Sequence, residues 1–170
     1  MKRLMFLSGV LLLNVAMAFG QADKSSRPSP PATVSGKSAG GANVKIDYST
    51  PSVKGRTVGG DVAPNGKVWR AGANEATILE VDKDVTIEGK KVPAGKYTLW
   101  AIPGEKETTI IINKETGQWG TQYKEGQDLV RVAGKTEKAP AFTEKLTYVI
   151  DKSGKVSLLW GDKAYVFNVK

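Results

Sequence analysis

Two short segments of the sequence place aromatic, amide and charged side chains close together along the chain. The first lies within residues 51–76 and contains Trp69, Arg70, Asn74 and Glu75. A tryptophan beside an arginine offers a flat apolar ring next to a planar cation with several hydrogen-bond donors. Residues 51–76 are also glycine-rich and long for a connection in a compact domain, which is typical of functional loops. This segment therefore suits ligand binding.

The second segment is residues 113–120, which read NKETGQWG. A ring with polar neighbours fits a sugar, because a pyranose has an apolar face and a rim of hydroxyl groups. We assign no catalytic residue in either segment. The candidate ligand-binding residues of the two segments together are Trp69, Arg70, Asn74, Glu75, Asn113, Lys114, Gln118 and Trp119.

The same side chains also suit a purely structural role. Trp69 fits a position in a hydrophobic core, and Asn74 fits a turn. Arg70 and Glu75 have the charges to form an internal ion pair that braces the loop. Trp119 fits the edge of a sheet as a cover. A binding site and a set of fold-stabilising motifs therefore stand as alternatives.

The chain contains no histidine and no cysteine. This composition excludes a Ser–His–Asp triad, a Cys–His pair and disulfide bonds, and it argues against a zinc site. We expect no metal and no cofactor. A carboxylate pair that hydrolyses a glycan is the alternative function, with Glu75 and Glu115 in the two segments and Asp61 and Asp128 as further carboxylates. The composition thus leaves enzymatic activity open without favouring it.

Residues 1–20 have the pattern of a cleavable signal peptide. Lys2 and Arg3 precede an apolar run, and small residues then permit cleavage after Gly20, with Ala18 and Ala22 as alternative sites. The run is short for a transmembrane helix, and no later stretch approaches that length. We expect an exported protein, periplasmic or secreted, without a transmembrane segment after cleavage.

The charge balance gives little information about partners. The chain has 25 basic and 17 acidic residues, and two of the basic ones, Lys2 and Arg3, lie in the leader. The others are dispersed, which indicates a solvated, lysine-rich surface. No nucleic-acid-binding motif is present, so we expect no nucleic-acid partner. An envelope glycan or another exported protein is the candidate partner.

The rest of the sequence predicts β-structure. Residues 21–31 are polar and proline-rich, as in a flexible lead-in. Residues 32–170 predict one all-β domain, a β-sandwich or alternatively a β-barrel, of about ten short, mainly antiparallel strands. The expected strands are residues 33–35 and 43–48, which form a hairpin, then 77–81, 85–88, 96–102, 108–113, 129–133, 145–151, 155–160 and 163–169.

Several strand pairings follow from the turns between these segments. Residues 77–81 and 85–88 are expected to pair, and residues 96–102 are expected to be central because both their faces carry apolar residues. Gly161–Asp162 suits a two-residue hairpin loop, which would place Trp160 opposite Lys163. That register directs a stripe of aromatic and aliphatic side chains toward the core.

Four stretches of the sequence carry a family resemblance. They are PSVKGR at 51–56, GKVWRAGANEAT at 66–77, PAGKYTLWAIPG at 93–104 and NKETGQWG at 113–120. Together they resemble the bacterial family catalogued as domain of unknown function 2911, whose members are typically exported. The family has no established activity, so the resemblance transfers no catalytic residue. It implies that the two candidate segments are signature motifs of the family.

From the sequence we therefore expect an exported, non-catalytic binding or structural module of the bacterial cell envelope.

Overall fold

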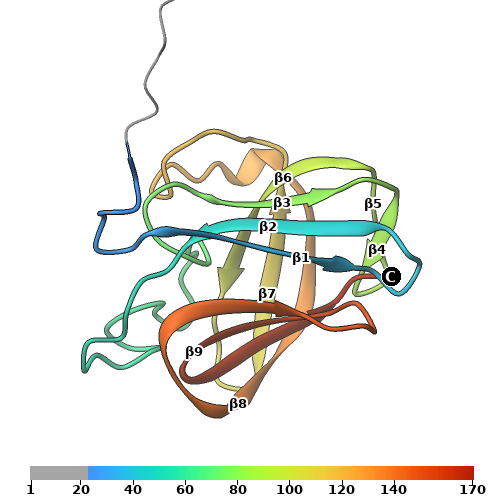
Figure 1. Ribbon diagram of the computed structural model, residues 1–170. Coiled ribbons are helices and arrows are strands. Elements are labelled where there is room, and N and C mark those ends of the chain that lie inside the picture. The colour runs from blue at the N-terminus through green and yellow to red at the C-terminus, as the bar shows by residue number, and fades with distance from the viewer. Residues whose placement is uncertain (1–22) are drawn as a thin grey trace, which may run out of the picture.

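The structure is a computed structural model that describes residues 23–170, so the predicted signal peptide and its cleavage sites lie outside the described residues. The described chain is almost entirely β-structure, which confirms the all-β prediction (Figure 1). Within this part of the chain, no helix has the length and hydrophobicity needed to cross a membrane. The elements are β1 (Pro31–Lys37), β2 (Asn43–Ser49), β3 (Thr77–Val81), β4 (Val85–Ile87), β5 (Lys90–Val92), β6 (Gly95–Ile102), β7 (Glu107–Asn113), the short 3₁₀ turn η1 (Glu125–Gln127), β8 (Asp128–Ile150) and β9 (Lys155–Asn168).

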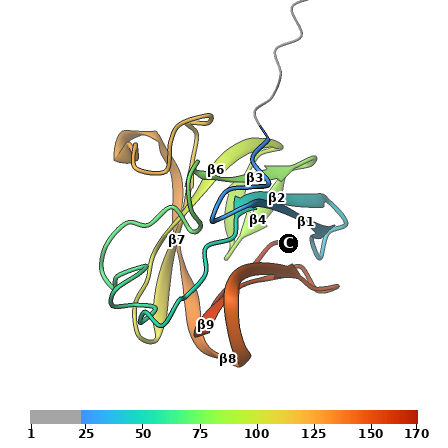
Figure 2. The same ribbon diagram turned by 60° about the vertical axis from the view of Figure 1, so that its left-hand side comes forward.

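Seven strands form one antiparallel sheet in the order β1-β2-β3-β6-β7-β8-β9, and β4 pairs separately with β5. The large sheet curls into a half-barrel in which β1, β2 and β3 lie across from β8 and β9, with β6 and β7 joining the two sides (Figure 2). The curl brings the first strand close to β8, because a Cβ added at Gly36 would lie 2.6 Å from Cγ2 of Ile150. The fold thus combines the curl of a barrel with two layers that face each other.

The hydrophobic core fills the inside of the curl. Side chains alternate along the strands, so that Val44 and Ile46 of β2 are buried while Lys45 between them is exposed. Leu79 of β3 and Leu99 of β6 join the same core. Burial of each such side chain contributes about 1.5–3 kcal/mol, so the inward-facing side chains together are the main contribution that stabilises the curled sheet.

Two predictions about the first half of the sheet are confirmed and one is wrong. β1 and β2 form the predicted antiparallel hairpin, and β6 is central, between β3 and β7. β3 does not pair with β4 but with β2 and β6. β4 instead pairs with β5 through Glu88 and Gly89, which have φ angles of 44° and 80°. Positive φ at two consecutive residues is what a tight hairpin turn requires, and here it makes β4–β5 a separate small sheet.

The predicted hairpin at Gly161–Asp162 is also wrong, because β9 runs without a turn from Lys155 to Asn168. Gly161 has a φ of 61° and lies opposite the irregular stretch of β8, where the register shifts on either side of Thr143. A glycine at positive φ suits one type of bulge as well as a tight turn, and a bulge moves the following residues to the other face of the strand. The residues of the predicted core stripe are therefore buried, as expected: Val156, Leu158, Trp160, Tyr165 and Phe167.

The long connection over residues 51–76 forms part of the core. Val53, Val58 and Ala71 are buried and belong to the main hydrophobic cluster. The segment is also tied to β8, since the backbone N–H of Val53 donates to the carbonyl of Glu144 at 2.9 Å. Several points of residues 51–76 are therefore packed against the sheet, while residues 54–57 and 65–68 between them are exposed.

Candidate functional site

The structure brings the two candidate segments into direct contact. Glu75 and Trp119 form an antiparallel bridge, and the N–H of Gly120 donates to the carbonyl of Asn74 at 2.9 Å. Gly120 fits only because it has no side chain: an added Cβ would collide with Cδ of Arg70 and lie 2.7 Å from the carbonyl oxygen of Asn74. Residues from distant parts of the sequence therefore share one region of the surface.

Trp69 anchors the first segment in the core. Its ring stacks on Trp160, with ring centroids 5.7 Å apart and planes 12° apart, and it meets Tyr165 edge-on at 6.2 Å. Its backbone pairs with Ala101 of β6 in both directions, at 2.8 and 2.9 Å. The structural role considered for Trp69 therefore applies, and this anchor fixes the position of the neighbouring Arg70.

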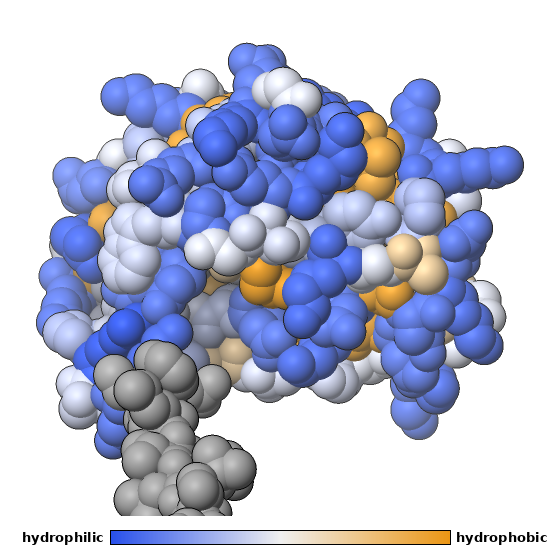
Figure 3. Space-filling view, turned by 90° about the horizontal axis from the view of Figure 1, so that it is seen from above, coloured by the Kyte–Doolittle hydropathy of each residue, from blue (hydrophilic) through white to orange (hydrophobic). Residues whose placement is uncertain are grey.

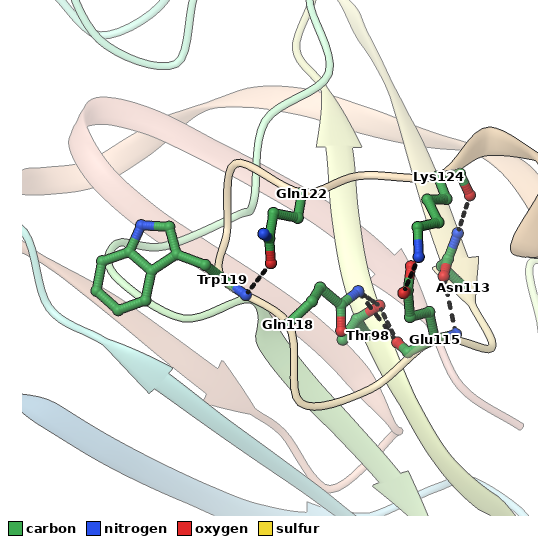
Figure 4. A network of polar contacts seen from close by, with 7 residues as sticks. All are labelled: Thr98, Asn113, Glu115, Gln118, Trp119, Gln122 and Lys124. Carbon is green, nitrogen blue, oxygen red and sulfur yellow. Dashed lines mark hydrogen bonds and ion pairs between the residues drawn. The ribbon is translucent and has the colours of Figure 1, made fainter.

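Asn113 is the buried centre of the second segment (Figure 4). Its Nδ2 donates to the carbonyl of Lys124 at 2.9 Å and to Oδ1 of Asp128 at 2.8 Å. Its Oδ1 accepts from the N–H of Glu115 at 2.9 Å. Three hydrogen bonds to a fully buried amide are a structural arrangement, and they close the connection between β7 and β8.

Gln118 lies beside this network and is only partly satisfied. Its Nε2 donates to the carbonyl of Glu115 at 3.2 Å and, weakly, to Oγ1 of Thr98 at 3.4 Å (Figure 4). Lys124 forms an ion pair with Oε1 of Glu115 at 2.6 Å. Oε1 of Gln118 and Oε2 of Glu115 are buried and accept no hydrogen bond from the described residues. Each buried acceptor without a donor lowers stability by about 1–3 kcal/mol, so this loop contains two acceptors whose hydrogen bonds are unmade.

Trp119 points away from that network (Figure 4). Its side chain is 44% exposed, which is unusual for so large an apolar ring. Its backbone is held by Gln122: the N–H of Trp119 donates to Oε1 of Gln122 at 3.3 Å, and its carbonyl accepts the N–H of Gln122 at 2.9 Å. Lys114, at the start of the same segment, is also exposed. These two side chains are the exposed ones among the candidate residues of this segment.

Asn74 and Glu75 connect the domain to the segment before β1. Asn74 has a φ of 59°, and its Nδ2 donates to the carbonyl of Ser29 at 2.9 Å. Glu75 forms ion pairs with Lys24 and Arg27, each at 2.9 Å. The Lys24 ammonium, together with Arg27, lowers the pKa of Glu75 to about 2. The described part of the predicted lead-in thus lies against the candidate site. The polar, proline-rich sequence of the lead-in did not predict this contact.

Arg70 does not form the ion pair with Glu75 that we considered from the sequence. Arg27, Arg56 and Arg131 all have hydrogen-bond or ion-pair partners. The guanidinium of Arg70 has none among residues 23–170, although it is half-buried and its burial lowers its pKa. A partly desolvated cation without an anion is an expensive arrangement in a folded protein.

The carboxylates considered for hydrolysis are engaged in local structure. Glu75 and Glu115 have the ion pairs described above, and Asp61 accepts the backbone N–H of Thr57 at 2.8 Å. Asp128 accepts the phenol of Tyr123 and pairs with Arg131, both at 2.7 Å. In the described part of the chain, no three histidine, cysteine or acidic side chains gather in a way that would hold a metal ion. Each of these four carboxylates therefore has a structural partner in the fold.

Comparison with known proteins gives a family but no activity. A family model described as Protein of unknown function (DUF2911) matches residues 29–169. No curated protein and no solved structure shows significant similarity to the chain. The match covers all nine strands and both candidate segments, as the resemblance of the four sequence stretches predicted. The chain belongs to this family of unknown function, DUF2911.

Proposed function

We propose that this chain is an exported, non-catalytic binding module of the bacterial cell envelope, with its ligand surface where residues 69–75 meet residues 113–120. Export rests on the signal-peptide pattern of residues 1–20, with residues 32–170 as the binding domain. The ligand surface rests on the joined segments, since a rigid scaffold that presents loops is the usual architecture of a binding site.

The observation that carries the proposal is the state of Arg70. Its guanidinium is half-buried and has no partner among the described residues, while the other described arginines do. An anion bound to Arg70 would compensate for the desolvation of the guanidinium. A planar guanidinium binds a carboxylate or phosphate through two parallel hydrogen bonds. The ligand that best fits this residue therefore carries such a group.

Trp119 narrows the class of ligand further. Trp119 has an exposed ring and lies opposite Glu75 in the antiparallel bridge. The aliphatic stem of Arg70 packs against Gly120, the next residue in the chain. A sugar stacks on such a ring through its apolar face, while an acidic group on the same sugar reaches a cation nearby. An acidic glycan of the envelope combines both features.

The state of Glu75 supports binding rather than hydrolysis. A glycosidase needs a carboxylic acid whose pKa is raised so that it can donate a proton. The pKa of Glu75 is instead lowered to about 2 by Lys24 and Arg27, so it stays ionised at neutral pH. Glu75 consequently suits the role of an ion-pair partner that holds the lead-in, and not that of a general acid.

Isothermal titration calorimetry with a uronic acid oligosaccharide and a neutral oligosaccharide of equal length tests the proposal. We expect the acidic compound to bind more tightly. Arg70→Gln should weaken its binding at least about tenfold, because a hydrogen bond to a charged group contributes about 1.5–3 kcal/mol. Trp119→Ala should weaken both compounds. Arg56→Gln, which removes the same charge from an exposed position, should bind as wild type does.

The structural alternative makes the opposite forecast. If the motifs only stabilise the fold, Arg70→Gln lowers the melting temperature and leaves no difference between acidic and neutral compounds. Unchanged affinity of the acidic compound for Arg70→Gln would reject the proposed site.

A further inference from the structure

A small pocket lies beside the candidate site, between the described lead-in and strands β2 and β3. Its volume is about 140 Å³. The walls are mainly apolar and the rim carries two carboxylates, and the lining residues are Lys24, Pro31, Asp47, Tyr48, Ser49, Glu75, Ala76 and Ile78. A small, mainly apolar pocket that is open to solvent and has an anion at its edge offers the contacts that a short alkyl chain ending in a cation needs.

The two carboxylates at this rim differ in their partners. Asp47 is satisfied by its own sheet, since it accepts the hydroxyl of Thr33 at 2.6 Å and pairs with Lys45 at 2.9 Å. Glu75 has its cations only from the segment before β1, namely Lys24 and Arg27. Glu75 is therefore the carboxylate that the domain leaves available when this segment is elsewhere.

Lys24 shows which group the Glu75 carboxylate accepts at the edge of this pocket. Its ammonium lies 2.9 Å from Oε1 of Glu75, and Lys24 itself lines the pocket. Arg27 spans both oxygens of the same carboxylate, at 2.9 and 3.0 Å. Lys24 and Arg27 precede the region matched by the family model, which begins at residue 29, whereas Glu75 and the rest of the pocket belong to it. The family domain thus supplies the pocket, and a preceding segment supplies the cation.

We propose that this pocket is a binding site for a primary alkylammonium group, namely a lysine side chain of a partner protein, which pairs with Glu75 in place of Lys24 when the lead-in leaves. The alkyl stem lies along Ala76 and Ile78, and the ammonium meets Glu75. Because Lys24 and Arg27 compete for the same carboxylate, the lead-in lowers the apparent affinity of any such ligand. The site is separate from Arg70 and binds a group of opposite charge.

Titration of the purified chain with pentylammonium, followed by amide chemical shifts in NMR, tests this inference. The decisive variant is the double substitution Lys24→Gln and Arg27→Gln, which removes both internal cations from exposed or half-exposed positions. We expect it to bind pentylammonium at least about tenfold more tightly than wild type, with shift changes at residues 48, 75, 76 and 78. Adding Glu75→Gln to this variant should abolish the binding.

Two comparisons make the result specific. Pentanol has the same stem without the charge and should not bind at the same concentrations, and Arg70→Gln should leave pentylammonium binding unchanged. Equal affinity of wild type and the double variant, shift changes away from the pocket, or equal binding of pentanol would each overturn the proposal. Because the proposed function is tested with anions and with Arg70 and Trp119, either proposal can fail without the other.

Discussion

A buried amide with three well-formed hydrogen bonds makes Asn113 the most constrained of the candidate residues. Asn113→Ala would leave the carbonyl of Lys124 and the N–H of Glu115 without their partner. We expect this substitution to lower the free energy of unfolding by about 1–3 kcal/mol, because buried polar groups that lose a partner keep their desolvation cost. Urea denaturation followed by tryptophan fluorescence measures the difference.

The neighbouring Lys114→Ala is the matched control, since Lys114 is exposed and its side chain lies outside this network. Its free energy of unfolding should stay within about 0.5 kcal/mol of wild type. Equal stability of Asn113→Ala and Lys114→Ala would contradict the structural role assigned to Asn113.

The sequence identified which residues cluster but not which way they face. Trp69 and Trp119 have similar polar neighbours along the chain, yet the first stacks in the core and the second is exposed. The difference arises from Trp160, which is distant in sequence and provides a ring for Trp69 to stack on. Similarly, the expected Arg70–Glu75 pair is displaced by Lys24 and Arg27, whose approach depends on the path of the chain before β1. Local pattern carries no information about such contacts.

At the scale of elements, residues 51–76 contribute side chains to the core as well as candidate residues to the surface. Val58 is 5% exposed within the main cluster and contacts the bulge at Gly161. Val58→Ala should lower the free energy of unfolding by about 1–3 kcal/mol, through lost burial and the cavity left behind. Thermal or urea unfolding measures this effect.

Val68→Ala is the corresponding control in the same segment, because Val68 is 39% exposed. Its stability should match that of wild type within about 0.5 kcal/mol. A segment that acts only as a mobile loop would instead tolerate both substitutions equally.

The contact between the lead-in and Glu75 predicts a pH dependence with a definite sign. Lys24 and Arg27 lower the pKa of Glu75 from 4.5 to about 2, so docking of the lead-in favours the ionised carboxylate. The resulting stabilisation is complete above pH 4.5 and is lost as the pH falls toward 2. Titration of the Glu75 carboxyl carbon by NMR should therefore give a midpoint well below the usual value.

The double variant Lys24→Gln and Arg27→Gln provides the comparison for this titration. Its midpoint should move up toward the ordinary pKa of a glutamate, because the two cations that favour the ionised form are gone. A midpoint in wild type already at that ordinary value would show that the lead-in does not dock on Glu75 in solution.

Most strand positions and the β1–β2 pairing were predictable from sequence, while β5, the middle of β8, the other pairings and the turn at Gly161 were not. Alternation of apolar and polar residues locates β2, and β-branched and aromatic residues locate β6 and β7, because these patterns report burial of one residue at a time. The choice between a hairpin and a bulge at Gly161 depends on whether β8 is long enough to pair with all of β9, which is a property of another strand. For the same reason, β3 pairs with β2 and β6 rather than with the next segment in sequence.

For the whole molecule, the curled sheet encloses one main hydrophobic cluster between Pro31 and Asn168, with two smaller clusters of buried residues beside it. The face seen from above is mainly hydrophilic, with small hydrophobic patches separated by polar residues (Figure 3). A surface of this kind favours ligands that combine charge with a limited apolar contact over broad hydrophobic docking. Both proposed sites have that character, one for an anionic sugar and one for an alkylammonium group.

Export is the prediction that concerns the whole chain. A bacterium that expresses the full sequence should release a shortened protein beginning at Gln21, or at Phe19 or Asp23 if the alternative sites are used. Mass spectrometry of the periplasmic and secreted fractions identifies that residue, and Ala18→Arg, which places a large charge before the Gly20 site, should prevent cleavage there. Recovery of only uncleaved protein in the cytoplasm would contradict export. Each of the three sites leaves Lys24 and Arg27 on the exported chain, so processing preserves the segment that pairs with Glu75.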